Sequence, residues 1–145
     1  MKESLATGNL EKMLEVLKRL FDSIPYQIHM KHEYYYHSIF CAIMNLLGFS
    51  INAEVSVSGG RIDAILELAD KVYIVEFKYE NCEKGASVEE KQKLFDDALK
   101  KGMDQITDRG YANKYDGSGK EIFKAAFAFL GRDDIQMRVI KSLIT

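Results

Sequence analysis

Apolar and polar positions alternate most regularly across the middle of the chain. Residues 60–68 and 72–79 are both rich in β-branched and aromatic side chains, and the polar stretch 69–71 separates them. Two such runs with short polar punctuation between them predict a strand, a turn and a second strand. The remaining elements are organised around this hairpin.

The two sides of the second predicted strand differ in character. Successive strand residues point to opposite faces of a sheet, and one face carries only side chains suited to packing: Tyr73, Val75, Phe77 and Tyr79. The other face begins with Val72 and Ile74 and ends with Glu76 and Lys78. A face that is apolar at its start and ionised at its end is typical of a strand that leaves the core and enters a site.

The length of the turn decides which face Asp63 shares. We expect Asp70-Lys71 to form a two-residue turn, which pairs Ala69 with Val72, Ile65 with Glu76, and Asp63 with Lys78. Directly paired residues share a face, so Asp63, Glu76 and Lys78 should meet in one patch. A three-residue turn would pair Asp63 with Phe77 and send it to the opposite face. The even-length turn is preferred because it keeps the apolar side continuous.

Helical and alternating spacing predict the other elements. We expect an amphipathic helix within residues 1–25, a helix over 31–47, a strand over 51–58, a long helix from residue 87 onward, an almost continuously apolar strand over 122–130 and an edge strand over 135–143. The apolar strand fits a central or parallel position, covered on both sides. The order α-α-β-β-β-α-β-β predicts one α/β domain, a mixed sheet flanked by helices on both faces.

Helix starts and buried stripes follow from the same spacing. Asn9 is a candidate N-cap of the first helix, and Ser87 and Glu90 have the spacing of a capping box. The expected buried stripes are, in chain order, Leu10, Met13, Leu14, Leu17, Leu20 and Phe21; Tyr36, Ile39, Phe40, Ile43, Met44 and Leu47; and Leu94, Phe95, Ala98, Leu99, Met103 and Ile106.

An Asp, a Glu and a Lys that meet at a strand end have a definite chemistry. Two carboxylates hold a hard divalent cation such as Mg²⁺ (or Mn²⁺) and leave several waters on it. Such a cation acidifies a water and neutralises charge on a phosphodiester, while the ammonium orients the nucleophile or stabilises developing negative charge. The alternative is a cross-strand salt bridge between Asp63 and Lys78 on a solvated edge. Hairpin composition taken alone fits the salt bridge better.

The residues also carry a family resemblance. Gly60-Arg61-Ile62-Asp63, twelve residues, and Glu76-Phe77-Lys78 resemble the signature of the PD-(D/E)xK nuclease superfamily. The wider chain is similar to the PD-(D/E)xK domain at the C-terminus of bacterial AAA-ATPase-like proteins. The matching stretches cover roughly residues 30 to 140 and include 33–37, 47–49, Glu54, the hairpin, and Gln105-Ile106 with Tyr111.

The resemblance implies a restriction-endonuclease-like fold and a set of roles. Asp63 and Glu76 would hold the metal together with the backbone carbonyl of Phe77, and Lys78 would position or activate the water. The matching helix glutamate, Glu33, would assist the metal site, or would only favour the helix dipole at its N-terminus. Gln105 resembles the glutamine of RecB-like nucleases, which supports the catalytic lysine or the phosphate. A helix-edge glutamine bonded to backbone is the alternative.

The resemblance also implies a domain arrangement. We expect residues 1–25 to form an N-terminal helix that can link to a preceding domain, and residues 26–145 to form the nuclease-like domain. An ATPase-like domain in a longer parent protein is the expected neighbour. Glu54 is a candidate for a supporting position, and Arg61 would bind a phosphate or, more simply, pair with an acid. His29, His32 and His37 match no common zinc spacing.

Length, composition and net charge limit the classes of function and partner that this chain can have. The chain of 145 residues suits one domain, and no apolar run approaches the roughly 20 residues of a membrane span. Cys41 and Cys82 form no motif, which is consistent with a reduced, cytoplasmic protein. The family resemblance implies a bacterial source. The net charge of −2 and the pI of about 5.9 argue against autonomous tight binding of long DNA. Two functions therefore stand: Mg²⁺-dependent hydrolysis of DNA phosphodiesters, or a non-catalytic module that binds nucleic acid or a protein beside an ATPase-like domain.

Overall fold

The architecture is known from a computed structural model. It describes residues 3, 7–22, 33–46, 51–57, 60–82, 85–109, 119–130 and 134–142, with the side chains of all of these except 21–22, 33–37, 44, 46, 51–57, 60–62, 109 and 142. The elements are α2 (Leu10–Asp22), α3 (Glu33–Leu46), β1 (Ile51–Val57), β2 (Gly60–Glu67), β3 (Lys71–Glu80), α4 (Val88–Arg109), β4 (Glu121–Leu130) and β5 (Asp134–Ser142).

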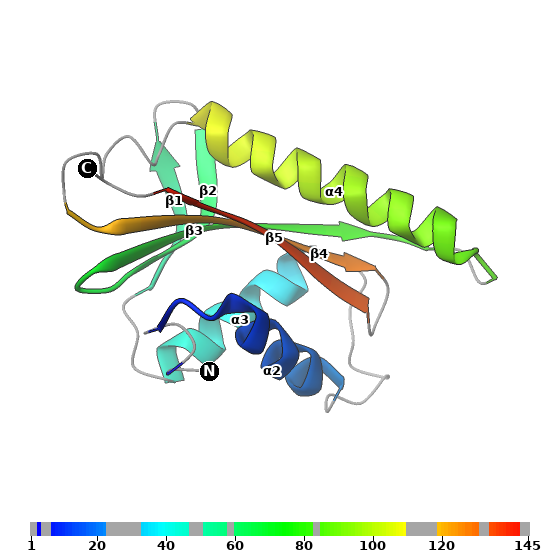
Figure 1. The fold of residues 1–145 in the computed structure, drawn as a ribbon, viewed down its shortest axis with the longest axis horizontal. Coiled ribbons are helices and arrows are strands. Elements are labelled where there is room, and N and C mark those ends of the chain that lie inside the picture. The colour runs from blue at the N-terminus through cyan, green and yellow to red at the C-terminus, as the bar shows by residue number, and fades with distance from the viewer. Residues whose placement is uncertain are drawn as a thin grey trace.

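The described strands form one mixed sheet in the order β1-β2-β3-β4-β5. Strands β3 and β4 pair in parallel, and the other neighbouring pairs are antiparallel. The α4 helix connects the two parallel strands and runs back over the sheet from the end of β3 (Figure 1). The predicted element order, the central position of the apolar strand and the edge position of the last strand are confirmed.

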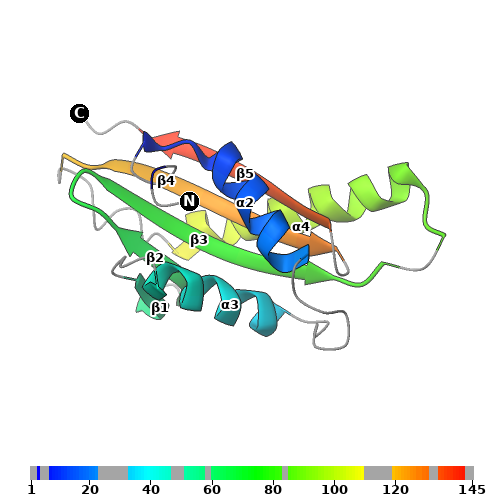
Figure 2. The same ribbon diagram turned by 90° about the horizontal axis from the view of Figure 1, so that it is seen from below.

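Helices cover both faces of the sheet, as predicted. The α4 helix lies on one face, and α2 and α3 lie on the other (Figure 1). Seen from that second side, α2 crosses β4 and β5 while α3 lies along β1, β2 and β3 (Figure 2). The molecule therefore has two apolar layers, separated by the sheet.

Strand β3 divides its side chains between these two layers. Tyr73, Val75 and Phe77 belong to the buried cluster beneath α2 and α3, and Tyr79 packs against it. Val72 and Ile74 belong to the cluster beneath α4. This alternation is the one expected of a strand with a distinct residue set on each face.

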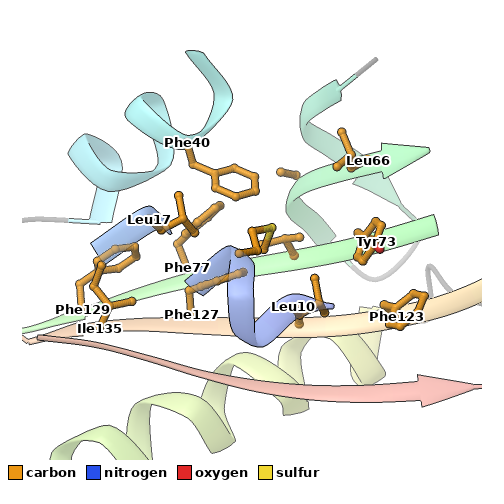
Figure 3. Close-up of a cluster of buried hydrophobic side chains, with 14 residues drawn as sticks. Leu10, Leu17, Phe40, Leu66, Tyr73, Phe77, Phe123, Phe127, Phe129 and Ile135 are labelled. Carbon is orange, nitrogen blue, oxygen red and sulfur yellow. The ribbon is translucent and has the colours of Figure 1, made fainter. Parts of the chain in front are cut away.

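Aromatic rings dominate the layer beneath α2 and α3. Phe40 of α3 meets the ring of Phe77 edge-on, with 5.0 Å between centroids. Phe77 stacks on Phe127 of β4 at 5.8 Å, and these rings lie together with Leu17 of α2 (Figure 3). Aromatic pairs with these geometries stabilise beyond their buried area, so this layer anchors both helices to the sheet.

The helix starts follow the predicted capping residues. The Asn9 side-chain oxygen accepts a hydrogen bond from the Lys12 amide at 3.2 Å, and the Ser87 hydroxyl accepts one from the Glu90 amide at 3.1 Å. The predicted inner stripe of α4 is confirmed. One member of the α2 stripe is wrong, because Leu20 is 37% exposed. Leu20 lies one turn beyond Leu17, two residues before α2 ends at Asp22.

The hairpin turn lies one residue earlier than expected. The Leu68 amide donates to the Lys71 carbonyl at 2.7 Å, which leaves Ala69 and Asp70 in the turn. The cross-strand pairs are Glu67 with Val72, Leu66 with Tyr73, Ile65 with Ile74, and Ala64 with Val75. The expected pairs Ala69–Val72, Ile65–Glu76 and Asp63–Lys78 are therefore wrong.

Lys71 explains the shift. It is 7% exposed, it pairs with Glu121 at the start of the parallel ladder, and its ammonium donates to Asp70 at 2.8 Å. The Asp70 carbonyl also accepts from the Glu121 amide at 3.0 Å. These contacts draw Lys71 into the strand and out of the turn. The register moves by two residues, so every side chain keeps its predicted face.

Candidate active site

The pairing of β2 with β3 changes character at Asp63 and Glu76. The backbone ladder runs as far as Ala64 and Val75, and the next position in register places Asp63 across from Glu76. Here two bonds from side chain to backbone join the strands. The Asp63 amide donates to Glu76 Oε1 at 3.3 Å, and the Phe77 amide donates to Asp63 Oδ2 at 2.8 Å. Each carboxylate is thus oriented by the backbone of the opposite strand.

The three residues of the predicted triad share the face covered by α4. Ala64 belongs to the layer beneath α2 and α3 and Ile65 to the layer beneath α4, so alternation places Asp63 on the α4 face. Glu76 and Lys78 both lie under α4, because a Cβ atom placed on Gly102 would touch both side chains. The even-length turn correctly predicted this shared face, although it placed the pairs two residues too far along.

Burial differs sharply among the three. Glu76 is only 1% exposed, whereas Asp63 and Lys78 are half-buried. A buried carboxylate is costly unless it is hydrogen-bonded or neutralised, and the Asp63 amide supplies one donor to Glu76. Among the described residues no ion pair joins Asp63 to Lys78. The salt-bridge interpretation of the triad therefore has no support in the structure.

Gly102 lets α4 approach the sheet directly above this site. A Cβ atom at Gly102 would lie 2.9 Å from the Ala126 Cβ, 3.8 Å from the Glu76 Cβ and 3.8 Å from the Lys78 Cγ. The first distance is shorter than a side chain tolerates, so only glycine permits this helix–sheet spacing. Sequence reasoning missed Gly102. The clue was a glycine within the apolar stripe of a long helix, where it costs about 1 kcal/mol relative to alanine.

Gln105 lies one helical turn beyond Gly102. Its side chain is half-buried, and its Oε1 atom is a buried acceptor without a hydrogen-bond donor in the described part of the chain. Buried polar atoms are nearly always paired. The Gln105 Oε1 atom is therefore suited to accept a hydrogen bond from a protonated side chain, a water or a substrate group. The α4 helix also contacts β2, the strand of Asp63, toward its C-terminal end (Figure 1). The distance from Gln105 to Lys78 stays a prediction.

Several sequence candidates fall outside the described side chains. Glu33 opens α3, which packs on the sheet face opposite to α4, and the role of its side chain stays a prediction. Glu54 occupies the β1 register position across from Asp63, between the pairs Ala53–Ala64 and Val55–Ile62. Tyr111 and the three histidines belong to the same group, as do the side chains of Arg61 and Arg109.

Two of the basic side chains of α4 form ion pairs with carboxylates. Lys100 pairs with Asp104 at 3.0 Å along the exposed helix, and Lys91 reaches Asp134 of β5 at 4.0 Å. Exposed pairs of this kind contribute little to stability. The α4 sequence has six acidic and five basic residues, so its basic side chains fit an ordinary solvated face.

The fold and the site together define a class of protein. A family model described as the PD-(D/E)XK nuclease superfamily matches residues 31–138. The chain belongs to this superfamily and has its restriction-endonuclease-like α/β fold.

One curated relative extends the comparison. The chain is 29% identical over 107 residues to the "Uncharacterized protein in vnfD 5'region" of Azotobacter chroococcum mcd 1. The match covers 70% of this chain and 18% of that protein, so the chain spans less than a fifth of the relative's length. Among the described helices, none has the length and hydrophobicity needed to cross a membrane.

Proposed function

We propose that this domain is a nuclease that hydrolyses DNA phosphodiester bonds with the help of Mg²⁺ or Mn²⁺. The observation that carries the proposal is the reciprocal pair of hydrogen bonds between β2 and β3. These bonds hold the Asp63 and Glu76 carboxylates beside each other, on the sheet face that also carries Lys78. The superfamily match supports the nuclease chemistry.

The residues present suit a hard divalent cation. Each carboxylate accepts a hydrogen bond from a backbone amide through one oxygen. Its second oxygen lies beside the first and can bind a cation. Phe77 donates its amide toward Asp63, and a strand residue directs its amide and its carbonyl to the same edge, so the Phe77 carbonyl faces the same gap. Carboxylate and carbonyl oxygens are the ligands that Mg²⁺ prefers. A bound cation of this kind supplies an acidified water and neutralises phosphodiester charge.

The remaining residues have supporting roles in this proposal. Lys78 orients the attacking water or stabilises the negative charge that develops on the phosphate oxygens in the transition state. Gln105 supports Lys78 by accepting a hydrogen bond at its buried amide oxygen, or supports the phosphate by donating from its amide NH₂ group. Glu33 assists the metal site from the start of α3. Sequence similarity to the family motifs supports the roles given to Gln105 and Glu33.

We also propose a setting for the domain. It acts on nucleic acid, with DNA as the substrate, in the bacterial cytoplasm. Its neighbour in a longer parent protein is an ATPase-like domain. The much greater length of the Azotobacter relative is consistent with such an arrangement.

A metal series with matched variants tests the proposal. Plasmid and branched oligonucleotides are incubated with the wild type, Asp63→Asn and Asp108→Asn across a range of Mg²⁺ and Mn²⁺ concentrations. Asp63→Asn should lose both metal affinity and cleavage, because a neutral amide is a poor ligand for a hard cation. Asp108→Asn removes an equal charge from an exposed position of α4 and should behave like the wild type.

Two results would contradict the proposal. Cleavage that persists in Asp63→Asn would mean a different site or a contaminating nuclease. A wild type that binds no metal and cleaves nothing would favour the non-catalytic binding module, to which the net charge of −2 lends weight.

A further inference from the structure

A pocket of about 390 Å³ lies where β3 ends and α4 begins. Its volume is at the lower end of the range for small-molecule sites. Six of its lining residues matter here: Asn81, Cys82, Glu90, Lys93, Leu94 and Asp97. The catalytic residues proposed above are not among the residues that line it, so the pocket is separate from the candidate active site.

The pocket is lined by residues that lie just beyond β3 and along α4, the two elements that also contribute to the candidate active site. Asn81 follows Lys78 by three residues, about 10 Å along an extended chain. On the helix, Leu94 precedes Gly102 by eight residues, about 12 Å along the axis, and Gly102 lies over Glu76 and Lys78. A nucleic acid strand covers such a distance in a few nucleotides. A strand cleaved at the site can therefore place a neighbouring nucleotide in the pocket.

The charges of the pocket argue against a phosphate as its ligand. Glu90 and Asp97 contribute two carboxylates and Lys93 one ammonium, so the lining has a net negative charge and repels anions. The carboxylates instead accept hydrogen bonds from N–H groups. Leu94 and Cys82 add apolar surface, which suits the face of a flat ring.

Asn81 adds a positioned donor. The Tyr79 hydroxyl donates to Asn81 Oδ1 at 3.2 Å. Because that bond occupies the amide oxygen, Asn81 interacts with a ligand through its NH₂ group, which only donates hydrogen bonds. The pocket thus combines donors, acceptors and an apolar surface. An unpaired nucleobase with an exocyclic amino group has the complementary edge and faces, since carboxylates accept from the amino group of cytosine.

We propose that this pocket binds an unpaired base carrying an exocyclic amino group, such as cytosine, on the strand held at Asp63, Glu76 and Lys78. The inference rests on the proposed nuclease function and narrows its substrate. A base inside a duplex has its amino group paired, so the bound strand must be single-stranded, frayed or unpaired near the cleavage point.

Binding of labelled oligonucleotides tests this inference without cleavage. Fluorescence anisotropy is measured with Ca²⁺ in place of Mg²⁺, so that a hard cation is available to the carboxylates. The probes are oligo-dT octamers that carry one central cytosine, uracil or abasic site, and gel electrophoresis checks that they stay intact. The wild type should bind the cytosine octamer about fivefold more tightly than the uracil octamer. Cytosine presents an amino donor where uracil presents a carbonyl oxygen, which the two carboxylates repel.

Charge-neutral variants link the preference to the pocket. The double variant Glu90→Gln/Asp97→Asn should lose or reverse the preference, because its amides can donate to the uracil oxygen. Glu89→Gln/Asp108→Asn is the matched control: it also removes two negative charges from α4, at positions outside the pocket lining. The control should keep the preference. All four positions are exposed, and melting curves check that the variants fold.

Each outcome bears on the inference. Equal binding of the cytosine, uracil and abasic octamers overturns it, as does a preference that survives in the double variant. Free deoxycytidine monophosphate that competes as tightly as the octamer overturns the strand assignment and indicates a mononucleotide site. If the pocket fails these tests while Asp63-dependent plasmid cleavage persists, the nuclease function stands. If no nucleic acid and no metal bind, the function itself fails.

Discussion

At the centre of the sheet, the two faces carry side chains of different size. Beneath α2 and α3, the centre of β3 and β4 presents large rings such as Phe77 and Phe127, closed over by Phe40. Beneath α4, the neighbouring positions are Glu76 and Ala126, closed over by Gly102. Large rings fill one layer completely, whereas small residues on the other bring a helix close to a buried carboxylate. The first face is packed by aromatic rings, and the second carries the candidate active site.

The sharpest way to break this comparison is to empty the aromatic face. Phe127→Ala should destabilise the fold by about 3–5 kcal/mol, because Phe127 is fully buried against Phe40 and Phe77. Denaturant unfolding measures the loss. Val88→Ala, at a position 81% exposed, is the control and should change stability by no more than about 0.5 kcal/mol. A small effect of Phe127→Ala would mean that this face is not the principal core.

Changing the opposite face should affect chemistry more than stability. Lys78→Ala should reduce the cleavage rate about 10²–10³-fold, since it removes a charge that acts on the transition state. Metal affinity should be retained or slightly increased, because a neighbouring positive charge is gone. Cleavage rates and metal titrations measure both, with Lys101→Ala on the exposed side of α4 as the control. If Lys78→Ala lowered only the melting temperature and left the cleavage rate unchanged, the role of Lys78 would be structural.

Adding one methyl group at Gly102 probes how closely the two layers approach. Gly102→Ala should lower stability by about 1–3 kcal/mol through overpacking against Ala126, partly offset by up to about 1 kcal/mol of helix propensity. It should also weaken metal binding, because Glu76 and Lys78 lie under the added group. The double variant Gly102→Ala/Ala126→Gly restores the space. If the double variant does not recover metal affinity, the contact is not what positions the site.

The smallest expected effect concerns pH and the aromatic face alone. Burial, with the negative charges of Asp70 and Glu121, raises the pKa of Tyr73 from 10.0 to about 12. The folded state favours the neutral phenol, so this contribution to stability is complete below pH 10 and is lost as the pH rises toward 12. Ultraviolet titration of the wild type against Tyr73→Phe should show one tyrosine missing from the late part of the curve. A missing early component instead would mean that Tyr73 is solvated.

Local patterns account for much of the fold. Period-2 alternation in β3 and helical spacing in α4 depend only on the order of residues, so both layers could be predicted, as could the caps at Asn9 and Ser87. The family motif likewise follows from spacing. The turn was misplaced because Lys71 is drawn into β3 by its contacts with Glu121 and Asp70, and Glu121 is distant in the chain. Leu20 was misassigned because a helical stripe does not show where its covering layer ends.

The order of residues by itself therefore determined the element order, the residue set of each face and the three residue types at the candidate site. Those features are set by short-range periodicity, which every segment carries alone. Only the tertiary structure decided the reciprocal bonds of Asp63 and Glu76, the approach of α4 at Gly102, and the pocket between β3 and α4. Each of these depends on two or more distant segments meeting in space, and close packing between them is felt at the scale of a single methyl group.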